Sequence, residues 1–157
     1  MLGSYVLKPL RPSDHNAVRE VYIDAIESLG ASLYTKEQIE AWLGLAWLPG
    51  VLDTPLAHGR GWISLENQNL AAFAVRYPFD RLALLYCRSD FARRGHASVL
   101  LDYLEQEALQ EGQTKLVTEA SFFSYPLLLR RGWTLIAPEN IEIGGVSFVR
   151  YLMEKIL

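Results

Sequence analysis

Residues 86–98, near the middle of the chain, combine residue types that bind phosphate groups. Two adjacent arginines, Arg93 and Arg94, and a glycine, Gly95, stand directly before a segment with helical spacing. The first amides of a helix have no partner within the helix, and the helix dipole adds partial positive charge there. Gly95 lets a ligand approach the backbone closely, and each guanidinium adds a full charge. The stretch predicts a site for a di- or polyphosphorylated cofactor; the plainer alternative is a basic loop with a tight turn.

Other cofactor and metal motifs do not fit the sequence. A P-loop needs Gly-Lys-Ser/Thr, and a Rossmann fingerprint needs three glycines at fixed spacing; neither pattern fits this loop. The three histidines and the single cysteine, Cys87, are scattered without metal-ligand spacing, so we expect no metal. No histidine stands at a recognisable spacing from Cys87, which is therefore expected to be a buried strand residue and not a nucleophile.

The periodicity of apolar residues places the loop between a buried strand and a helix. Residues 82–87 form a nearly continuous apolar run, which is typical of a strand covered on both faces. Apolar positions at helical spacing predict a helix from about Gly95 to Glu111, and residues 116–120 are expected to form the next strand. A strand–helix–strand order implies a parallel pair of strands with a right-handed crossover.

The rest of the chain predicts a mixed α/β (α+β) fold with helices on both faces of the sheet. A capping-box pattern of Thr35 and Gln38 opens one helix, and two consecutive glycines predict a tight hairpin turn near the end. Residues 45–59 are broken by Pro and Gly and are expected to be a loop. The other expected elements are strands over residues 5–10, 62–65, 70–77, 141–143 and 146–153, and helices over residues 13–30, 35–43 and 126–131.

The composition predicts one globular domain, residues 1–157, in a reducing compartment. Half of the residues are hydrophobic and 21% are charged, and at this length folding can bury roughly 68–70% of the extended chain's surface. One cysteine excludes an internal disulfide. The net charge of −3 gives no general attraction for nucleic acid or anionic membrane, and we read no secretion signal and no membrane-spanning stretch. We therefore expect a cytoplasmic protein without nucleic-acid or membrane partners.

Several stretches resemble the GNAT superfamily of acetyl-CoA-dependent N-acetyltransferases. Residues 92–97, Ala-Arg-Arg-Gly-His-Ala, are similar to its loop Gln/Arg-x-x-Gly-x-Gly/Ala, and Leu-Tyr-x-x-x-Asp-Phe at 85–91 is similar to its fourth strand. Residues 121–133, Ser-x-x-Ser-x-Pro-Leu-Leu-x-x-x-Gly-Trp, resemble the family's second motif. Residues 34–42 and 145–155 resemble one bacterial subgroup of mostly unassigned substrate. The likeness thus covers nearly the whole chain.

The resemblance implies a GNAT fold, with a twisted mixed sheet of about six or seven strands, and an acetyltransferase. Acetyl-CoA would be the cosubstrate, and a primary amine of a small molecule or a peptide or protein acceptor would attack it directly in a ternary complex. The resemblance leaves open the acceptor, the acyl chain length and the oligomeric state, for which a homodimer is one option. A non-catalytic acyl-CoA-binding or sensing domain is the alternative, and an interaction domain that only keeps the fold is a third.

The resemblance also implies cofactor-binding roles for individual residues. Ala92 stands where Gln or Arg is usual, and Arg93 is the candidate to replace the lost phosphate contact. The side chain of His96 is expected to project from the loop. The expected contacts are the pyrophosphate with the backbone amides of Arg94, Gly95, His96, Ala97 and Ser98, the pantetheine arm and thioester with the backbone of Leu85, Tyr86 and Cys87, and the cofactor near the splayed strands with Ser121.

The catalytic residues are the least constrained by the resemblance. Leu128 stands where many members have the tyrosine that protonates the leaving thiolate, and Tyr125, one helical turn earlier, is the candidate substitute. A thiol with a pKa of about 8.5 leaves tolerably well unaided, so a missing acid lowers the rate without abolishing it. The attacking amine must lose a proton, for which Glu119 is the candidate base. The alternative for Glu119 is a solvated or salt-bridged acid at a strand end.

Overall fold

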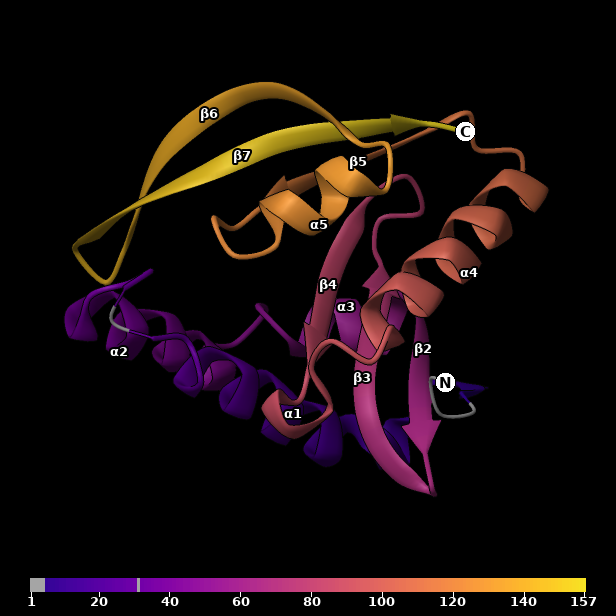
Figure 1. The fold of residues 1–157 in the computed structure, drawn as a ribbon, viewed down its shortest axis with the longest axis horizontal. Coiled ribbons are helices and arrows are strands. Elements are labelled where there is room, and N and C mark those ends of the chain that lie inside the picture. The colour runs from indigo at the N-terminus through magenta and orange to yellow at the C-terminus, as the bar shows by residue number, and fades with distance from the viewer. Residues whose placement is uncertain (1–4, 31) are drawn as a thin grey trace.

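The computed structural model describes residues 5–30 and 32–157. Within these residues the chain forms strands and helices in the predicted order, with one additional helix between residues 45 and 59 (Figure 1). The elements are β1 (Val6–Pro9), α1 (His15–Glu27), α2 (Lys36–Gly44), α3 (Asp53–His58), β2 (Arg60–Glu66), β3 (Asn69–Arg76), β4 (Leu82–Cys87), α4 (His96–Gln110), β5 (Lys115–Ala120), α5 (Tyr125–Arg130), β6 (Thr134–Ile143) and β7 (Val146–Ile156). Short 3₁₀ turns lie at Pro12–Asp14, Leu45–Trp47 and Ser89–Phe91.

The strands form two antiparallel sheets, in the orders β1-β2-β3-β4 and β5-β7-β6. One parallel bridge between Arg81 and Val117 connects the sheets in the described part of the chain. Beside it, the amide of Val117 donates to Asp80 O at 2.9 Å, and Thr118 Oγ1 donates to Leu82 O at 2.7 Å. Beyond the bridge, β4 and β5 run in different directions (Figure 1). The mixed α/β fold is thus confirmed, and its parallel strand pair is reduced to this bridge.

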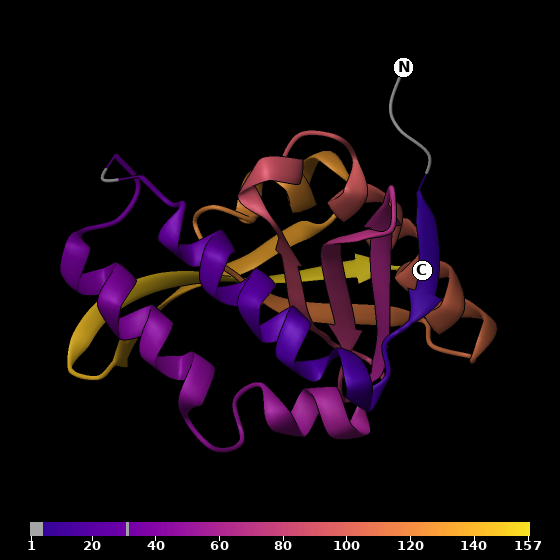
Figure 2. The same ribbon diagram turned by 90° about the horizontal axis from the view of Figure 1, so that it is seen from below.

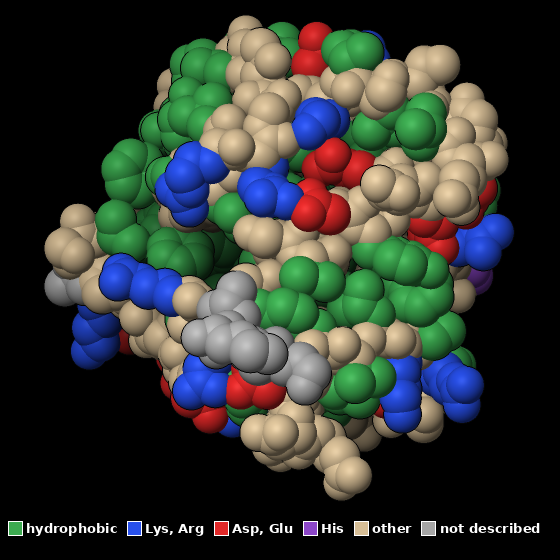
Figure 3. Space-filling view, turned by 45° about the vertical axis from the view of Figure 1, so that its right-hand side comes forward, with side chains coloured by type: hydrophobic (Ala, Val, Ile, Leu, Met, Phe, Trp, Pro, Cys, Tyr) green, Lys and Arg blue, Asp and Glu red, His purple; other side chains and the backbone are tan. Residues whose placement is uncertain are grey.

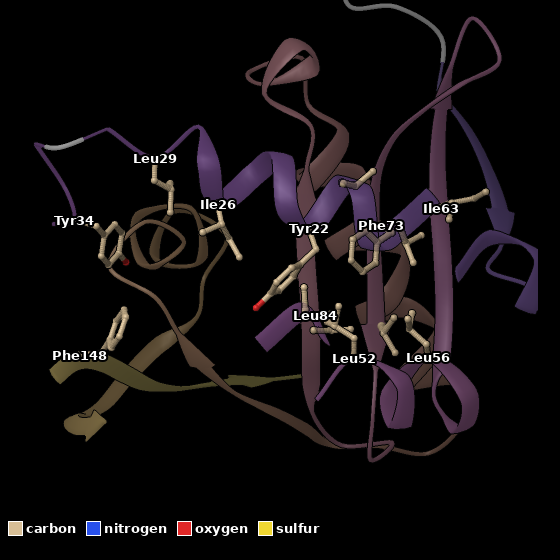
Figure 4. Close-up of a cluster of buried hydrophobic side chains, with 14 residues drawn as sticks. Tyr22, Ile26, Leu29, Tyr34, Leu52, Leu56, Ile63, Phe73, Leu84 and Phe148 are labelled. Atoms are coloured by element: carbon tan, nitrogen blue, oxygen red, sulfur yellow. The ribbon is translucent and has the colours of Figure 1, made fainter. Parts of the chain in front are cut away.

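Helices cover both faces of the four-stranded sheet, as predicted (Figure 2). The alternation of side chains along β3 explains why both faces are apolar. Phe73 and Val75 pack in one buried cluster with residues of α1 and α3, part of which Figure 4 shows. Ala72 and Ala74 pack in a second cluster with the apolar side of α4 and with Leu128 of α5.

Local sequence signals explain most of the turns and helix ends. Thr35 and Gln38 form the predicted capping box, in which the Gln38 amide donates to Thr35 Oγ1 at 3.1 Å and the Thr35 amide donates to Gln38 Oε1 at 3.0 Å. Asn67 and Gln68 adopt positive φ angles of 50° and 66°, which suit a tight hairpin turn between β2 and β3.

In the described chain, no helix is both long and apolar enough to cross a membrane.

The prediction that residues 45–59 form only a loop is wrong, because α3 lies within them. The Asp53 carboxylate accepts hydrogen bonds from the amides of Gly50 at 2.6 Å and Thr54 at 3.1 Å, which stabilises the start of this helix. Leu52 and Leu56 are buried in the first cluster, so the helix is anchored to the sheet. Pro49 and Gly50 precede α3, Pro55 lies in its first turn, and Gly59 follows its last residue.

Candidate functional site

The candidate site lies where β4 and β5 separate. Each of these strands is the edge of its sheet, since β4 pairs with β3 and β5 pairs with β7. Leu85, Tyr86 and Cys87 lie beyond the single bridge and are paired only toward β3 in the described sheets. An edge strand presents backbone N–H and C=O groups that an extended ligand can pair with. This part of β4 therefore has the geometry that the predicted pantetheine contact requires.

The loop after β4 has a backbone suited to anions. Arg93 has a φ of 63° and Gly95 a φ of 90°, so both lie in the left-handed region. Gly95 is the residue before α4, and its carbonyl accepts from the amide of Val99 at 3.0 Å. The amides that open α4, from His96 to Ser98, precede the first helical hydrogen bond and are free of helical partners. The loop thus combines a glycine turn with a helix N-terminus, as predicted.

The expectation that the His96 side chain projects from the loop is wrong. The imidazole is 1% exposed, and it lies against the four-stranded sheet. Its Nδ1 lies 2.7 Å from Ser64 Oγ, and its Nε2 lies 2.9 Å from Glu66 Oε1. Two polar partners on β2 offset the free-energy cost of burying the ring nitrogens. The imidazole is therefore no phosphate ligand, and only the backbone amide of His96 keeps its predicted role.

The two loop arginines differ in their surroundings. Arg94 is half-exposed, donates a hydrogen bond from Nη1 to the Glu66 carboxylate, and lies over the Phe91 ring at 5.5 Å. Its charge is therefore partly compensated within the protein. Arg93 is exposed and forms no ion pair within 4.0 Å among the described residues. Arg93 is the better placed of the two to supply an uncompensated charge to a phosphate.

The predicted catalytic base, Glu119, lies in an ion pair. Its two carboxylate oxygens accept from Arg81 Nε at 2.9 and 3.2 Å, and Arg81 also donates to Tyr77 O. Both side chains are partly exposed. This is the salt-bridged arrangement that was the alternative for Glu119, so a role as base requires the carboxylate to leave Arg81.

The second motif forms a capped turn between β5 and α5. The Ser121 amide donates to Ser124 Oγ at 3.0 Å, and the Ser124 amide donates to Ser121 Oγ at the same distance. This pairing holds Ser121 directly after β5, where the strands have separated. Tyr125 stacks on Tyr151 with ring centroids 4.5 Å apart, while Leu128 is buried among the core residues of α4.

Sequence reasoning gave no role to Tyr34, which the structure brings close to Ser121. Tyr34 precedes α2, and its ring centroid lies 5.4 Å from that of Trp42. It also lies 6.4 Å from the ring centroid of Phe148 (Figure 4). Burial raises the pKa of Tyr34, and the neighbouring Ser121 hydroxyl opposes that rise. Tyr34 stood in one of the motifs above, but only the folded chain places it beside Ser121, 87 residues later.

Burial also raises the pKa values of two groups on β4. It raises the pKa of the Tyr86 phenol to about 12. It raises the pKa of the Cys87 thiol to about 11, with smaller contributions from the carboxylates of Asp90, Asp24 and Glu66. A thiol with so high a pKa holds very little thiolate, which supports the prediction that Cys87 is no nucleophile.

Charges are mixed on one face of the molecule. On the face drawn in Figure 3, hydrophobic side chains line a hollow, and both basic and acidic side chains lie nearby. Binding of an anion would therefore depend on the local loop and the helix N-terminus, and not on a broad basic surface.

Comparison with known proteins agrees with this geometry. Residues 31–155 match the sequence model of a family described as the acetyltransferase (GNAT) domain. A search of curated proteins gives no significant match.

Solved structures have the same fold. A GCN5-related N-acetyltransferase of Rhodopseudomonas palustris has a TM-score of 0.93 and 25% identity, over 100% of this chain and 98% of that one. The PaiA N-acetyltransferase of Thermoplasma acidophilum, in complex with coenzyme A, has a TM-score of 0.75 and 16% identity, over 98% and 99% of the two chains. A GNAT family acetyltransferase of Elizabethkingia anophelis with acetyl-CoA bound has a TM-score of 0.64 and 18% identity, over 98% of each chain.

Proposed function

Because the chain belongs to the acetyltransferase (GNAT) domain family, we propose that it transfers an acetyl group from acetyl-CoA to a primary amine. The acceptor is a small molecule or a peptide or protein amine. One observation carries the proposal. Beyond the Arg81–Val117 bridge, β4 has a free edge in the described sheets, and the chain then continues through the left-handed Gly95 into α4. Together they offer backbone donors for both the extended and the phosphorylated part of one cosubstrate.

The residues present fit this cosubstrate. The φ of 90° at Gly95 and the absence of a side chain there leave the first amides of α4 open to a pyrophosphate. Arg93 adds an exposed positive charge. The backbone of Leu85, Tyr86 and Cys87 pairs with the pantetheine arm and polarises the thioester carbonyl, while Ser121 contacts the cosubstrate from the turn after β5. When bound, acetyl-CoA supplies an acetyl group that is already activated as a thioester.

The protein must also remove a proton from the amine and return one to the thiolate. An amine with a pKa of about 10.4 is mostly charged near pH 7.4, and its neutral form is roughly 4 kcal/mol uphill. Glu119 accepts this proton, directly or through water, once it has left Arg81. A phenol donates to the thiolate: Tyr125, or Tyr34, whose pKa is raised so that it keeps its proton. Direct attack in a ternary complex needs no covalent enzyme intermediate.

One calorimetric and one kinetic measurement test this proposal. Titration with CoA should show binding, and a panel of primary amines should include acceptors that release thiol from acetyl-CoA. Absence of CoA binding would contradict the proposal at its first step.

A non-catalytic acyl-CoA-binding domain is the second candidate. Two observations favour it: Ala92 stands where the family has Gln or Arg, and the buried Leu128 stands where many members have the acid. Tight CoA binding without thiol release across the amine panel would identify a sensor.

A further inference from the structure

A buried chain of hydrogen bonds connects β2 to the loop that precedes α4. It runs from Ser64 through His96 to Glu66, and ends at the half-exposed Arg94. Ser64 is 0%, His96 1% and Glu66 5% exposed. A buried carboxylate is costly unless it is paired, and here it has two partners, from residues on either side of Gly95.

The hydrogen-bond roles along this chain can be assigned from the charge of Glu66. The hydrogen bond from His96 lowers the pKa of Glu66 most, and Arg94 lowers it further. Glu66 is therefore a carboxylate at neutral pH. A carboxylate only accepts, and His96 Nε2–H therefore donates to it. With a neutral ring, Nδ1 accepts from the Ser64 hydroxyl. These contacts fix the ring orientation of the first residue of α4.

Aromatic and backbone contacts complete the enclosure of the loop. The Tyr5 ring meets the His96 ring edge-on at 4.8 Å, and the Phe91 ring does so at 5.9 Å. The Tyr5 hydroxyl also donates to the carbonyl of Arg94. Both neighbours of Gly95 are thus fixed by groups that lie far away in the sequence.

We infer that Glu66 and His96 are positioning residues that hold the loop and the first amides of α4 in the conformation that binds the cosubstrate's pyrophosphate. The inference rests on the proposed use of acetyl-CoA. A loop that is ordered before binding loses less conformational freedom when the ligand arrives, which strengthens binding without a new contact to it. Glu66 touches no part of the cosubstrate in this scheme, since its two oxygens bond His96 and Arg94.

The alternative for Glu66 is that it only competes with phosphate for Arg94. The two roles have opposite consequences. If Glu66 positions the loop, its removal weakens pyrophosphate binding. If it only competes, its removal frees Arg94 and tightens binding.

A truncated cosubstrate separates this role from general stability. Acetyl-pantetheine has the thioester and the arm that would lie along β4, but it lacks the pyrophosphate. For Glu66→Gln we expect KM for acetyl-CoA to rise about ten-fold, with KM for acetyl-pantetheine and kcat unchanged. A loss of a hydrogen bond to a charged group has this magnitude. Ser64→Ala removes a neutral partner of His96 and should raise KM for acetyl-CoA about three-fold.

Glu139→Gln is the matched control, because Glu139 pairs with Arg150 on the other sheet, away from the loop. It should leave both KM values unchanged. If Glu66→Gln does not fold, as judged by circular dichroism, Ser64→Ala decides. A parent-like or lowered KM for acetyl-CoA in the folded variants would overturn the inference, and so would equal increases for both cosubstrates. A parent protein that binds no CoA would overturn the proposed function as well, which distinguishes the two failures.

Discussion

Burial raises the pKa values of three single residues near the candidate site. Tyr34, Tyr86 and Cys87 are all shifted toward the neutral form. Neutral phenols can donate a proton, whereas a neutral thiol is a poor nucleophile. The same physical cause therefore favours proton donation by the phenols at the candidate site and disfavours nucleophilic attack by the thiol.

Cys87→Ala should keep most of the acetyltransferase activity. No acetylated enzyme should form when acetyl-CoA is added without an acceptor, which mass spectrometry can check. A pKa of about 11 instead of 9.0 leaves about 100-fold less thiolate at pH 8, so alkylation of the folded protein should be slow and should accelerate up to about pH 11. A stable acetyl-cysteine would make the mechanism two-step.

Glu119→Gln should lower kcat/KM by about 10²–10⁴-fold if Glu119 is the base. CoA affinity should stay nearly unchanged, and the rising limb of the pH–rate profile should change with the loss of the titrating group. Arg81→Gln is the matched variant, because it removes the ion pair but leaves the carboxylate. If both variants run at the parent rate with the parent pH profile, Glu119 is only an ion-pair partner.

Tyr34→Phe tests the phenol that the fold brings to Ser121. The change removes one hydroxyl and keeps the ring contacts with Trp42 and Phe148. If Tyr34 protonates the thiolate, kcat should fall by about 10²–10⁴-fold while the Kd for CoA stays constant. Because its pKa is raised, the limb it controls should lie above pH 10. A parent-like kcat in Tyr34→Phe together with a low kcat in Tyr125→Phe would assign the role to Tyr125.

The expectations for single residues were right where the local backbone conformation determines the structure. They were wrong where the surroundings of a side chain depend on residues distant in the sequence. The left-handed turn at Gly95 follows from a glycine before a helical pattern. The burial of His96 could not be predicted, because its partners Ser64 and Glu66 lie on β2, about 30 residues earlier in the chain. For Glu119 a salt bridge was the alternative, but its partner, Arg81 in the turn before β4, could not be identified from the sequence.

At the level of elements, local signals set the turns and the ends of helices. The capping box of α2 and the hairpin turn at Asn67 and Gln68 follow from residues within a few positions of each other. The helix α3 was missed because its apolar residues are few, and it is held by packing on the sheet. Tertiary contact thus overrode weak local preference at that one place.

Gly95→Leu should abolish CoA binding, because a side chain would occupy the space that the pyrophosphate needs. Gly112→Leu is a matched control: Gly112 has a φ of 92° at the other end of α4, and a Cβ there would meet no atom within 4 Å. Both variants should lose stability by about 1–2 kcal/mol from the left-handed backbone. Only Gly95→Leu should lose binding by calorimetry. Unchanged CoA affinity in Gly95→Leu would contradict the site.

At the scale of the whole molecule, the two sheets are built by consecutive parts of the chain. Residues up to the end of α4 supply β1 to β4, and residues from 115 onward supply β5 to β7. The two parts meet at the Arg81–Val117 bridge, in the core around α4, and through side chains of α4 such as Glu105, which accepts from Trp133 Nε1 at 3.1 Å. The division into these two sheets was not predicted, since the crossover rule gives a parallel pair but not its length.

The boundary between these two parts of the chain has a consequence for how the protein could be assembled from two fragments. A cut between Gly112 and Gln113 would separate the two sheets without dividing either of them. The proposed cosubstrate would contact both pieces, through the loop and β4 on one side and Ser121 on the other. A ligand that binds only the joined form stabilises it by about 2.7 kcal/mol at 100 times its Kd. Co-expressed fragments 1–112 and 113–157 should therefore associate more tightly when CoA is added, as analytical ultracentrifugation can measure. The cosubstrate would then act as a ligand that holds two separate chains together.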